Sequence, residues 1–268
     1  MSYPRRSVRL VRTATRLATR PEFTLRVVEC RDDHRGWSAP EQRAGRELVL
    51  ARHGRFRRRV RGQEFDIDPT IGYLSAPGDE EHFAHPAGGD LCTSISLDER
   101  LWPAEHASSP VYVDARLDLA HRRLLAVSRR GDVDYALVER LLGLLGAALA
   151  HTGRAPQRDA NARRLAARAR EAILAAHPAA DGLLPLAAHL GVSPYRLSRT
   201  FTRETGVSLT HYRNRVRVAH ALDRLEAGET NLALLAAELG FADQAHLTRT
   251  VRAHAGHTPA ALRALLQR

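Results

Sequence analysis

Lysine is absent from this chain of 268 residues, and cysteine, methionine and aromatic residues are scarce. All 41 basic residues are arginine, which we attribute to a GC-rich coding sequence rather than to function. Two cysteines are too few for a disulfide scaffold. No apolar run approaches the roughly 20 residues that cross a bilayer, and the basic N-terminus lacks the apolar stretch of a secretory signal. We therefore expect a cytoplasmic protein that makes no membrane contact.

The net charge of +11 is divided unevenly along the chain. Residues 160–268 carry a net charge of +7 and residues 1–20 carry +6, whereas residues 21–159 sum to −2. Basic charge concentrated in one region is typical of a protein that binds a polyanion, usually nucleic acid. The length predicts two domains, each able to bury its own core.

The first 114 residues divide into a basic arm and a region rich in β-like runs. Residues 1–20 contain no acid and show weak periodicity, which predicts a disordered arm; an arm that touches DNA is the alternative. In residues 21–114, short runs of β character are separated by turn sequences such as Arg61-Gly62 and Gly88-Gly89. These runs cover residues 23–28, 47–52, 54–60, 71–75 and 91–97. Their number and spacing predict a small β-barrel or sandwich.

Helical periodicity begins after residue 114. Apolar residues recur at helical spacing over residues 116–129 and 133–150, and the second segment is apolar on more than one face. We interpret residues 115–151 as a helical dimerisation element. Its apolar segment 133–150 must be buried, either against a second subunit or under the β-domain. Residues 152–160 have the composition of a linker, and residues 161–268 are helical in pattern throughout.

The helical region contains a repeat of about fifty residues. Residues 186–193 (LAAHLGVS) recur as 235–242 (LAAELGFA), and 197–201 (LSRTF) recur as 247–251 (LTRTV). In each copy a glycine predicts a tight turn between two helices, and Ser193 or Asp243 is placed to cap the second helix. The repeat therefore predicts two helix-turn-helix modules.

The second helix of each module has an inward apolar face and an outward polar face. Leu197 and Phe201 face inward in the first copy, as do Leu247 and Val251 in the second. Arginine can pair with guanine and glutamine with adenine in the major groove, so a polar face of this kind predicts DNA recognition. The candidate DNA-binding residues are Tyr195, Ser198, Arg199, Thr202, Gln244, Ala245, Thr248, Arg249 and Arg252.

The second module resembles the signature of the AraC/XylS family of bacterial transcription regulators, in residues 238–249 (ELGFADQAHLTR) and 256–259 (GHTP). The resemblance covers residues from about 160 to 268, and it implies seven helices with a long central helix over residues 209–227. By position, the base-reading residues of the family fall on Tyr195, Ser198, Arg199, Gln244, Ala245 and Arg249. Ala245 has only a methyl group and cannot form a hydrogen bond to a base, so recognition at this position differs from the pattern that the resemblance implies.

The resemblance also implies that residues 21–114 form a cupin-like effector domain. The expected fold is therefore α+β and multidomain, with an N-terminal cupin-like β-barrel and a C-terminal all-α double helix-turn-helix domain. Both cysteines lie in the expected sensor, each near histidine, which gives Cys30, His34, His82, His85 and Cys92 as candidate sensor residues.

Three interpretations of these cysteines remain open from the sequence. Cysteine with histidine suits tetrahedral zinc, although the spacing matches no compact finger. A thiol beside an imidazolium suits an oxidant sensor, as in a subset of AraC-type regulators. Buried thiols can also be inert apolar groups. We expect no obligatory cofactor, with zinc as the one candidate.

The sequence thus predicts a transcription regulator that is not an enzyme. Its expected partners are double-stranded DNA, a second copy of the chain and RNA polymerase. A metal-dependent cupin enzyme with a helical appendage is an alternative, but no His-x-His pair occurs in the chain. A nucleoid-like protein that binds DNA without sequence preference is the other alternative.

Overall fold

The computed structural model describes residues 12–31, 35–99, 101, 108–129, 135–152 and 159–267. The chain divides into two compact units. The N-terminal unit comprises Met1–Val113 and Val127–Arg154, and the C-terminal unit comprises Asp114–Ala126 and Ala155–Arg268. No helix in the described ranges is long and apolar enough to cross a membrane.

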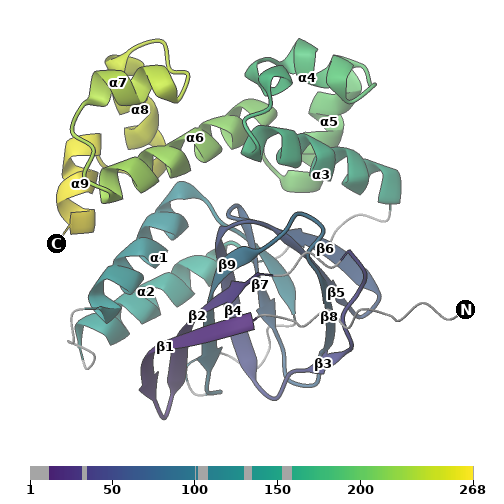
Figure 1. Ribbon diagram of the computed structural model, residues 1–268, viewed down its shortest axis with the longest axis vertical. Helices are drawn as coiled ribbons and strands as arrows, with labels where there is room; N and C mark the ends of the chain where they lie inside the picture. The colour runs from purple at the N-terminus through teal and green to yellow at the C-terminus, as the bar shows by residue number, and fades with distance from the viewer. Residues whose placement is uncertain are drawn as a thin grey trace, which may run out of the picture. The chain divides into compact units, whose positions relative to one another are not determined.

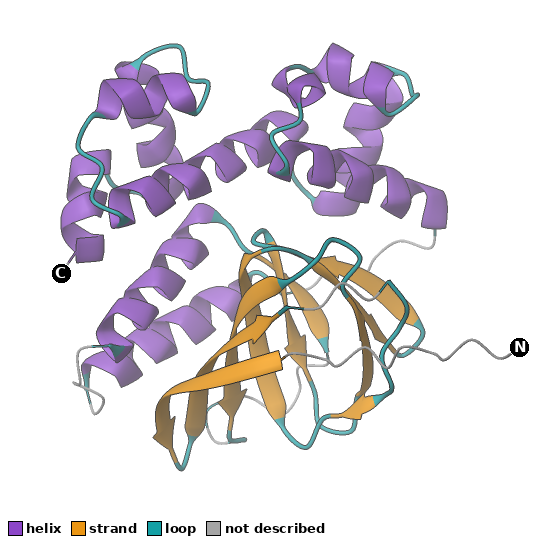
Figure 2. Cartoon of the chain, viewed as in Figure 1, coloured by secondary structure: helices purple, strands orange, loops and turns teal. Residues whose placement is uncertain are grey.

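The N-terminal unit is built from two antiparallel sheets (Figures 1 and 2). The six-stranded sheet has the order β1-β2-β9-β4-β7-β10, from β1 (Arg12–Arg20), β2 (Phe23–Cys30), β9 (Asp90–Leu97), β4 (Arg46–His53), β7 (Ile71–Ser75) and β10 (Ser109–Tyr112). The four-stranded sheet has the order β3-β8-β5-β6, from β3 (Glu41–Gln42), β8 (Glu80–Ala84), β5 (Phe56–Val60) and β6 (Gln63–Ile67). This architecture confirms the prediction of a small β-barrel or sandwich.

Alternating burial along the strands builds the core between the two sheets. In β5, Phe56, Arg58 and Val60 are buried while the residues between them are half-buried. The ring of Phe56 lies 5.9 Å from that of Phe83 and 6.4 Å from that of Tyr73. The predicted turn at Arg61-Gly62 joins β5 to β6, and both of its residues have positive φ, as a two-residue hairpin of type I′ requires.

Residues 12–20 correct the prediction of a basic arm over residues 1–20. They form β1, which pairs with β2 from Arg12 opposite Cys30 to Arg20 opposite Phe23. Most β1 side chains are exposed and only Ala18 is buried, so main-chain hydrogen bonds rather than an apolar face hold this edge strand. The apolar alternation that identifies a strand in a sequence is therefore missing. The rest of the predicted arm lies outside the described residues.

The two predicted helices after the β-domain form as α1 (Ala115–Ser128) and α2 (Ala136–Ala150). Most of α1 belongs to the C-terminal unit, whereas α2 belongs to the N-terminal unit. In the C-terminal unit Arg122 of α1 contacts Asp223 at 2.7 Å and Glu226 at 2.8 Å. The proposed dimerisation element is thus divided between the units.

The rest of the C-terminal unit is all helical, and its seven α-helices match the number that the resemblance implies. They are α3 (Ala160–Leu174), α4 (Leu183–His189), α5 (Pro194–Thr205), α6 (Leu209–Glu226), α7 (Leu232–Glu238), α8 (Gln244–Ala255) and α9 (Pro259–Gln267), with a 3₁₀ turn at Pro178–Asp181. The long helix α6 extends between the two modules (Figure 1) and contributes to both of their cores. Tyr212 and Val216 pack in the first core, and Val218 and Leu222 pack in the second.

Candidate nucleic-acid interface and sensor cavity

The sequence repeat corresponds to a repeat in backbone geometry. Gly191 and Gly240, which follow α4 and α7, both have φ of +69°. The Ser193 hydroxyl accepts a hydrogen bond from the Arg196 amide at 3.2 Å, and Asp243 Oδ1 accepts one from the His246 amide at 2.6 Å. Both turns and both caps are therefore as predicted, and each copy is a helix-turn-helix module.

The second helix of each module divides its side chains as the sequence predicts. Leu197, Phe201, Leu247 and Val251 are fully buried. The nine candidate DNA-binding residues are not buried: Tyr195, Arg199, Thr202, Gln244, Ala245, Arg249 and Arg252 are exposed, and Ser198 and Thr248 are half-buried. The outward faces of α5 and α8 are thus available to a ligand of the C-terminal unit.

The two outward faces differ in how their arginines are held. In α5, Arg199 Nη1 donates a hydrogen bond to the Tyr195 hydroxyl at 2.7 Å, and its guanidinium lies 5.4 Å from the centre of the Tyr195 ring. The equivalent of Tyr195 in α8 is Ala245, which cannot make either contact. Arg249 has no side-chain hydrogen bond to the described part of the chain. Of these two candidate DNA-binding arginines, Arg199 is therefore pre-oriented and Arg249 is not.

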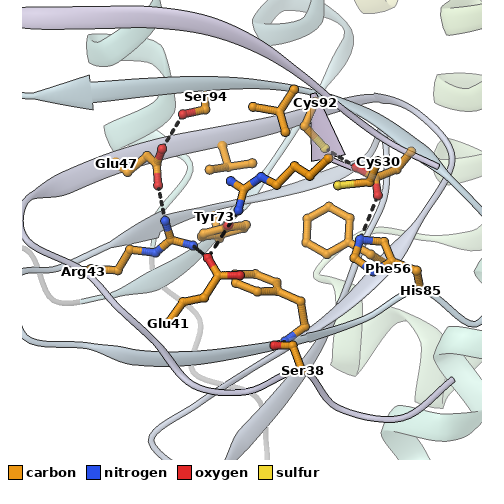
Figure 3. Close-up of a pocket in the computed structure, with 15 residues that line it drawn as sticks. Cys30, Ser38, Glu41, Arg43, Glu47, Phe56, Tyr73, His85, Cys92 and Ser94 are labelled. Atoms are coloured by element: carbon orange, nitrogen blue, oxygen red, sulfur yellow. Dashed lines mark hydrogen bonds and ion pairs between the residues drawn. The ribbon is translucent and has the colours of Figure 1, made fainter. Parts of the chain in front are cut away.

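The N-terminal unit contains a narrow cavity with about 50 Å³ of free volume. Figure 3 shows its lining, which includes a cluster of arginine and carboxylate groups and a second cluster with both cysteines. Arg43 of the first cluster also donates a hydrogen bond at 2.5 Å to Glu81, a fully buried residue outside the lining that accepts a second hydrogen bond from Arg58 Nε at 2.9 Å. The carboxylate of Glu81 is thus neutralised by two guanidinium groups, which suits a structural role.

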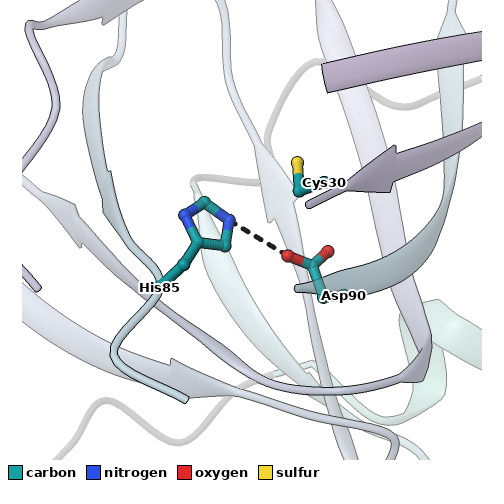
Figure 4. A group of neighbouring side chains, drawn as sticks. All are labelled: Cys30, His85 and Asp90. Atoms are coloured by element: carbon teal, nitrogen blue, oxygen red, sulfur yellow. Dashed lines mark ion pairs between the residues drawn. The ribbon is translucent and has the colours of Figure 1, made fainter. Parts of the chain in front are cut away.

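The second cluster, which we call the Cys-His-Asp cluster, comprises Cys30, His85, Asp90 and Cys92. His85 Nε2 lies 3.0 Å from Asp90 Oδ1, and Cys92 Sγ donates to Asp90 Oδ2 at 2.9 Å. One donor atom from each of Cys30, His85 and Asp90 lies within 4.8 Å of the other two (Figure 4). All four residues are buried.

Strand register brings the Cys-His-Asp cluster together. Cys30 of β2 is directly opposite Asp90 of β9, and Cys92 is opposite Val28, two residues earlier in β2. Because side chains alternate along a strand, Asp90 and Cys92 point to the same face as Cys30. His85 follows β8 in the other sheet, and its ring stacks on Phe56 with centroids 5.6 Å apart. The cluster therefore joins residues from both sheets.

The pKa values of two residues in the Cys-His-Asp cluster, His85 and Cys92, are raised. Burial opposes the protonation of His85, but its hydrogen bonds to Asp90 and Cys30 outweigh burial and raise its pKa to about 9. Burial, and then the Asp90 carboxylate, raise the pKa of the Cys92 thiol. His85 is therefore a cation at neutral pH and Cys92 remains a thiol.

Three of the five candidate sensor residues come together in the structure: Cys30, His85 and Cys92. His82 lies apart, because alternation along β8 turns it away from the cavity-lining Phe83; its Nδ1 donates to the Ser38 carbonyl at 3.0 Å. His34 lies outside the described residues. Asp90 was missed by sequence reasoning, although an acid two residues before Cys92 in a strand must share its face.

The described geometry defines a C-terminal domain of the helix-turn-helix class, and comparison with known proteins specifies the family. Residues 186–264 match a family described as a helix-turn-helix domain, of the AraC type. The chain therefore contains an AraC-type helix-turn-helix domain, which supports binding to double-stranded DNA. No curated protein matches the chain.

Solved structures with similarity to the chain cover either most of it or about a third of it. ToxT from Vibrio cholerae is 10% identical, with 92% of this chain and 100% of that chain covered and a TM-score of 0.36. The C-terminal domain of AraT, a response regulator from Geobacillus stearothermophilus, is 28% identical over 37% of this chain and 84% of that one, with a TM-score of 0.35. A cupin superfamily protein from Desulfitobacterium hafniense is 14% identical over 36% and 83%, with a TM-score of 0.29.

Proposed function

We propose that the chain recognises a specific double-stranded DNA site with both helix-turn-helix modules, and that its N-terminal unit adjusts this binding in response to an effector. The observation that carries the proposal is the pair of equivalent modules, each with a capped second helix whose outward face is polar. Arginine, glutamine, serine and threonine on such a face suit base edges and phosphates in a major groove.

In this proposal α5 and α8 enter successive major grooves roughly 34 Å apart along one face of the duplex. Arg199 and Arg249 pair with guanine O6 and N7, and Gln244 pairs with adenine N6 and N7. Ala245 contacts a thymine methyl group. The remaining members of the interface are Tyr195, Ser198, Thr202, Thr248 and Arg252, which contact the sugar-phosphate backbone or adjacent bases.

Selection of bound duplexes from a random pool by the purified full-length protein tests the proposal. The expected result is one enriched motif with two elements about a helical turn apart, and affinity that falls steeply with salt because arginines displace counterions. The nucleoid-like alternative predicts no enrichment over random duplex. The same selection is then repeated with the Arg199→Ala and Arg249→Ala variants. The element of the motif that each variant no longer enriches is the one that its module recognises.

We also propose that the chain is a homodimer through α2, and that RNA polymerase is its partner at a promoter. Leu142 of α2 is 48% exposed, and Tyr135, which immediately precedes the helix, is 81% exposed. Gly143 and Gly146 on this helix have open space where a Cβ would lie, so a second helix can approach closely.

We expect Leu142→Glu to convert a dimer to a monomer in sedimentation equilibrium, while Leu184→Glu on α4 does not. A wild-type monomer at micromolar concentration contradicts the proposal.

The effector that we propose acts at the Cys-His-Asp cluster, as an oxidant or as a metal ion. The raised pKa of Cys92 disfavours a thiolate at that residue, so Cys30, which hydrogen-bonds to His85, is the thiol that an oxidant would reach first. A disulfide is also disfavoured, since Cys30 and Cys92 are diagonal neighbours, which are typically about 7–8 Å apart, whereas a disulfide needs Cα atoms within about 6.8 Å. Metal binding requires neither a reactive thiolate before the ion arrives nor a bond between the two sulfur atoms.

A further inference from the structure

We propose that Cys30, His85, Asp90 and Cys92 form a closed, four-ligand zinc site that ties the two sheets of the N-terminal unit together. Two sulfur donors, one imidazole and one carboxylate are a donor set that suits tetrahedral Zn²⁺. Occupation of all four positions by protein leaves none open for a substrate, so the site is structural or regulatory rather than catalytic.

The distances in the cluster are close to those that zinc needs. Ligand atoms about 2.0–2.3 Å from a tetrahedral ion lie roughly 3–4 Å from one another. The donor atoms of Cys30, His85 and Asp90 already lie within 4.8 Å of one another, and Cys92 Sγ is 2.9 Å from Asp90. Cys92 Sγ is not one of these three mutually close donors and contacts the second carboxylate oxygen of Asp90, so zinc binding requires the three donors to close in and the Cys92 side chain to turn toward them. Neither movement changes the strand register.

The size and charge of the cavity also favour an ion. Its free volume of about 50 Å³ is far below the roughly 300–1,000 Å³ of sites for organic ligands, but it can hold an ion or a few water molecules. Arg12 lines the same cavity and is ion-paired to Glu41 at 3.3 Å. Two thiolates and one carboxylate leave a bound Zn²⁺ with net negative charge, which Arg12 offsets.

The site has a consequence for the fold. Cys30, Asp90 and Cys92 belong to the six-stranded sheet, whereas His85 follows β8 of the four-stranded sheet. A shared ion therefore adds a cross-link between the sheets and stabilises the N-terminal unit by mass action. The further role of zinc as the effector rests on the proposed function, whereas the existence of the site does not.

The first experiment measures zinc binding by the reduced, chelator-treated full-length protein, with zinc chloride as the probe and a chromogenic chelator as competitor. We expect one zinc per chain. We expect Cys30→Ser, Cys92→Ser, His85→Gln and Asp90→Asn each to weaken binding by at least about 100-fold, since even loss of an outer-shell partner costs 10–100-fold. The matched control is His82→Gln, which replaces a histidine of β8 outside the cluster and should leave binding unchanged.

Replacing zinc by cobalt in the wild-type protein identifies the ligands by spectroscopy, without a mutation that could impair folding. We expect thiolate-to-cobalt charge transfer and the intense ligand-field bands of a tetrahedral site. The proposal is overturned if wild-type protein takes up no stoichiometric zinc, if cobalt shows no thiolate band, or if a folded Cys30→Ser, Cys92→Ser double variant binds as wild type. Formation of a Cys30–Cys92 disulfide with peroxide in protein that takes up no zinc also overturns it, in favour of oxidant sensing.

A DNA-binding assay with and without zinc separates the two proposals. A change in affinity for the selected duplex that is absent from the Asp90→Asn variant supports zinc as the effector. Zinc uptake with unchanged DNA affinity overturns the effector role and leaves the site established. Absence of DNA binding in both states overturns the proposed function but does not affect the zinc site.

Discussion

The two helix-turn-helix modules share one backbone plan but differ in what they present outward. Gly191 and Gly240 have the same φ, and a side chain caps the second helix in both modules. On the outward faces, however, Arg199 of α5 donates a hydrogen bond to Tyr195, whereas Ala245 of α8 offers no such acceptor to Arg249. The turn and cap positions are thus equivalent in the two modules, and Arg199 recurs as Arg249, but its neighbour Tyr195 is replaced by Ala245.

The largest expected effect concerns the cores of the modules. Phe201 is fully buried and lies 5.2 Å from the ring of Tyr212, whereas its counterpart in module two is the smaller Val251. We expect Phe201→Ala to lower the free energy of unfolding of the C-terminal unit by about 3–5 kcal/mol, because it leaves a large cavity. Val251→Ala should cost less. Denaturant titration followed by circular dichroism measures both, and equal losses would show that the module cores are equally packed.

The next effect concerns base recognition by the two arginines. We expect Arg199→Ala and Arg249→Ala each to weaken binding to the selected duplex by about 1–3 kcal/mol and to relax preference at one base position. Affinity for random duplex should change little, since phosphate contacts dominate it. Fluorescence anisotropy at fixed salt measures both affinities. If both variants keep full affinity and specificity, α5 and α8 are not the reading helices.

A pH effect should distinguish module two from module one. Burial, and then the nearby charges of His211 and Arg215, lower the pKa of His254 in α8 to about 4, and the repeat places Glu204 at the equivalent position. A depressed histidine pKa means that the unfolded state binds more protons between about pH 6.5 and 4, so stability falls as pH falls through this window.

The expected size of this pH effect is modest because His254 is only half-buried. Discounted for solvent screening, the shift corresponds to about 1 kcal/mol, or roughly 2–4 °C in melting temperature. Thermal melts of wild type and His254→Gln between pH 7 and pH 4 measure it, with the exposed His257→Gln as control. Identical pH profiles for wild type and His254→Gln would remove His254 as the cause.

Local signals explain why the modules were predictable from sequence. Glycine at a turn, a capping side chain and apolar residues at three- and four-residue spacing all act within about twenty residues. The repeat presented each signal twice. The predicted central helix over residues 209–227 accordingly matches α6 to within one residue.

Features that depend on distant pairing were less predictable. Strand β1 is stabilised by its partner strand rather than by an apolar face, and the contacts of Arg122 with Asp223 and Glu226 join residues about a hundred positions apart. The place of Asp90 in the Cys-His-Asp cluster follows from the register of β9 against β2, which the sequence does not specify. His82 was predicted from proximity to Cys92 in sequence, and strand alternation separates the two.

The smallest expected effect tests the brace on Arg199 directly. Tyr195→Phe keeps the ring beside the guanidinium but removes the hydroxyl that accepts the hydrogen bond from Arg199. Because the pair is exposed, we expect a loss of only about 0.5 kcal/mol in binding to the selected duplex. The loss should vanish in an Arg199→Ala background, which a double-mutant cycle measures by anisotropy. Ala245→Tyr offers the reverse test, since it supplies module two with the same brace for Arg249. The alternative result is that Tyr195→Phe lowers affinity for the selected duplex equally in the wild-type and Arg199→Ala backgrounds. That result would show that Tyr195 contacts DNA itself. The two modules would then differ in a direct DNA contact rather than in the pre-orientation of their arginines.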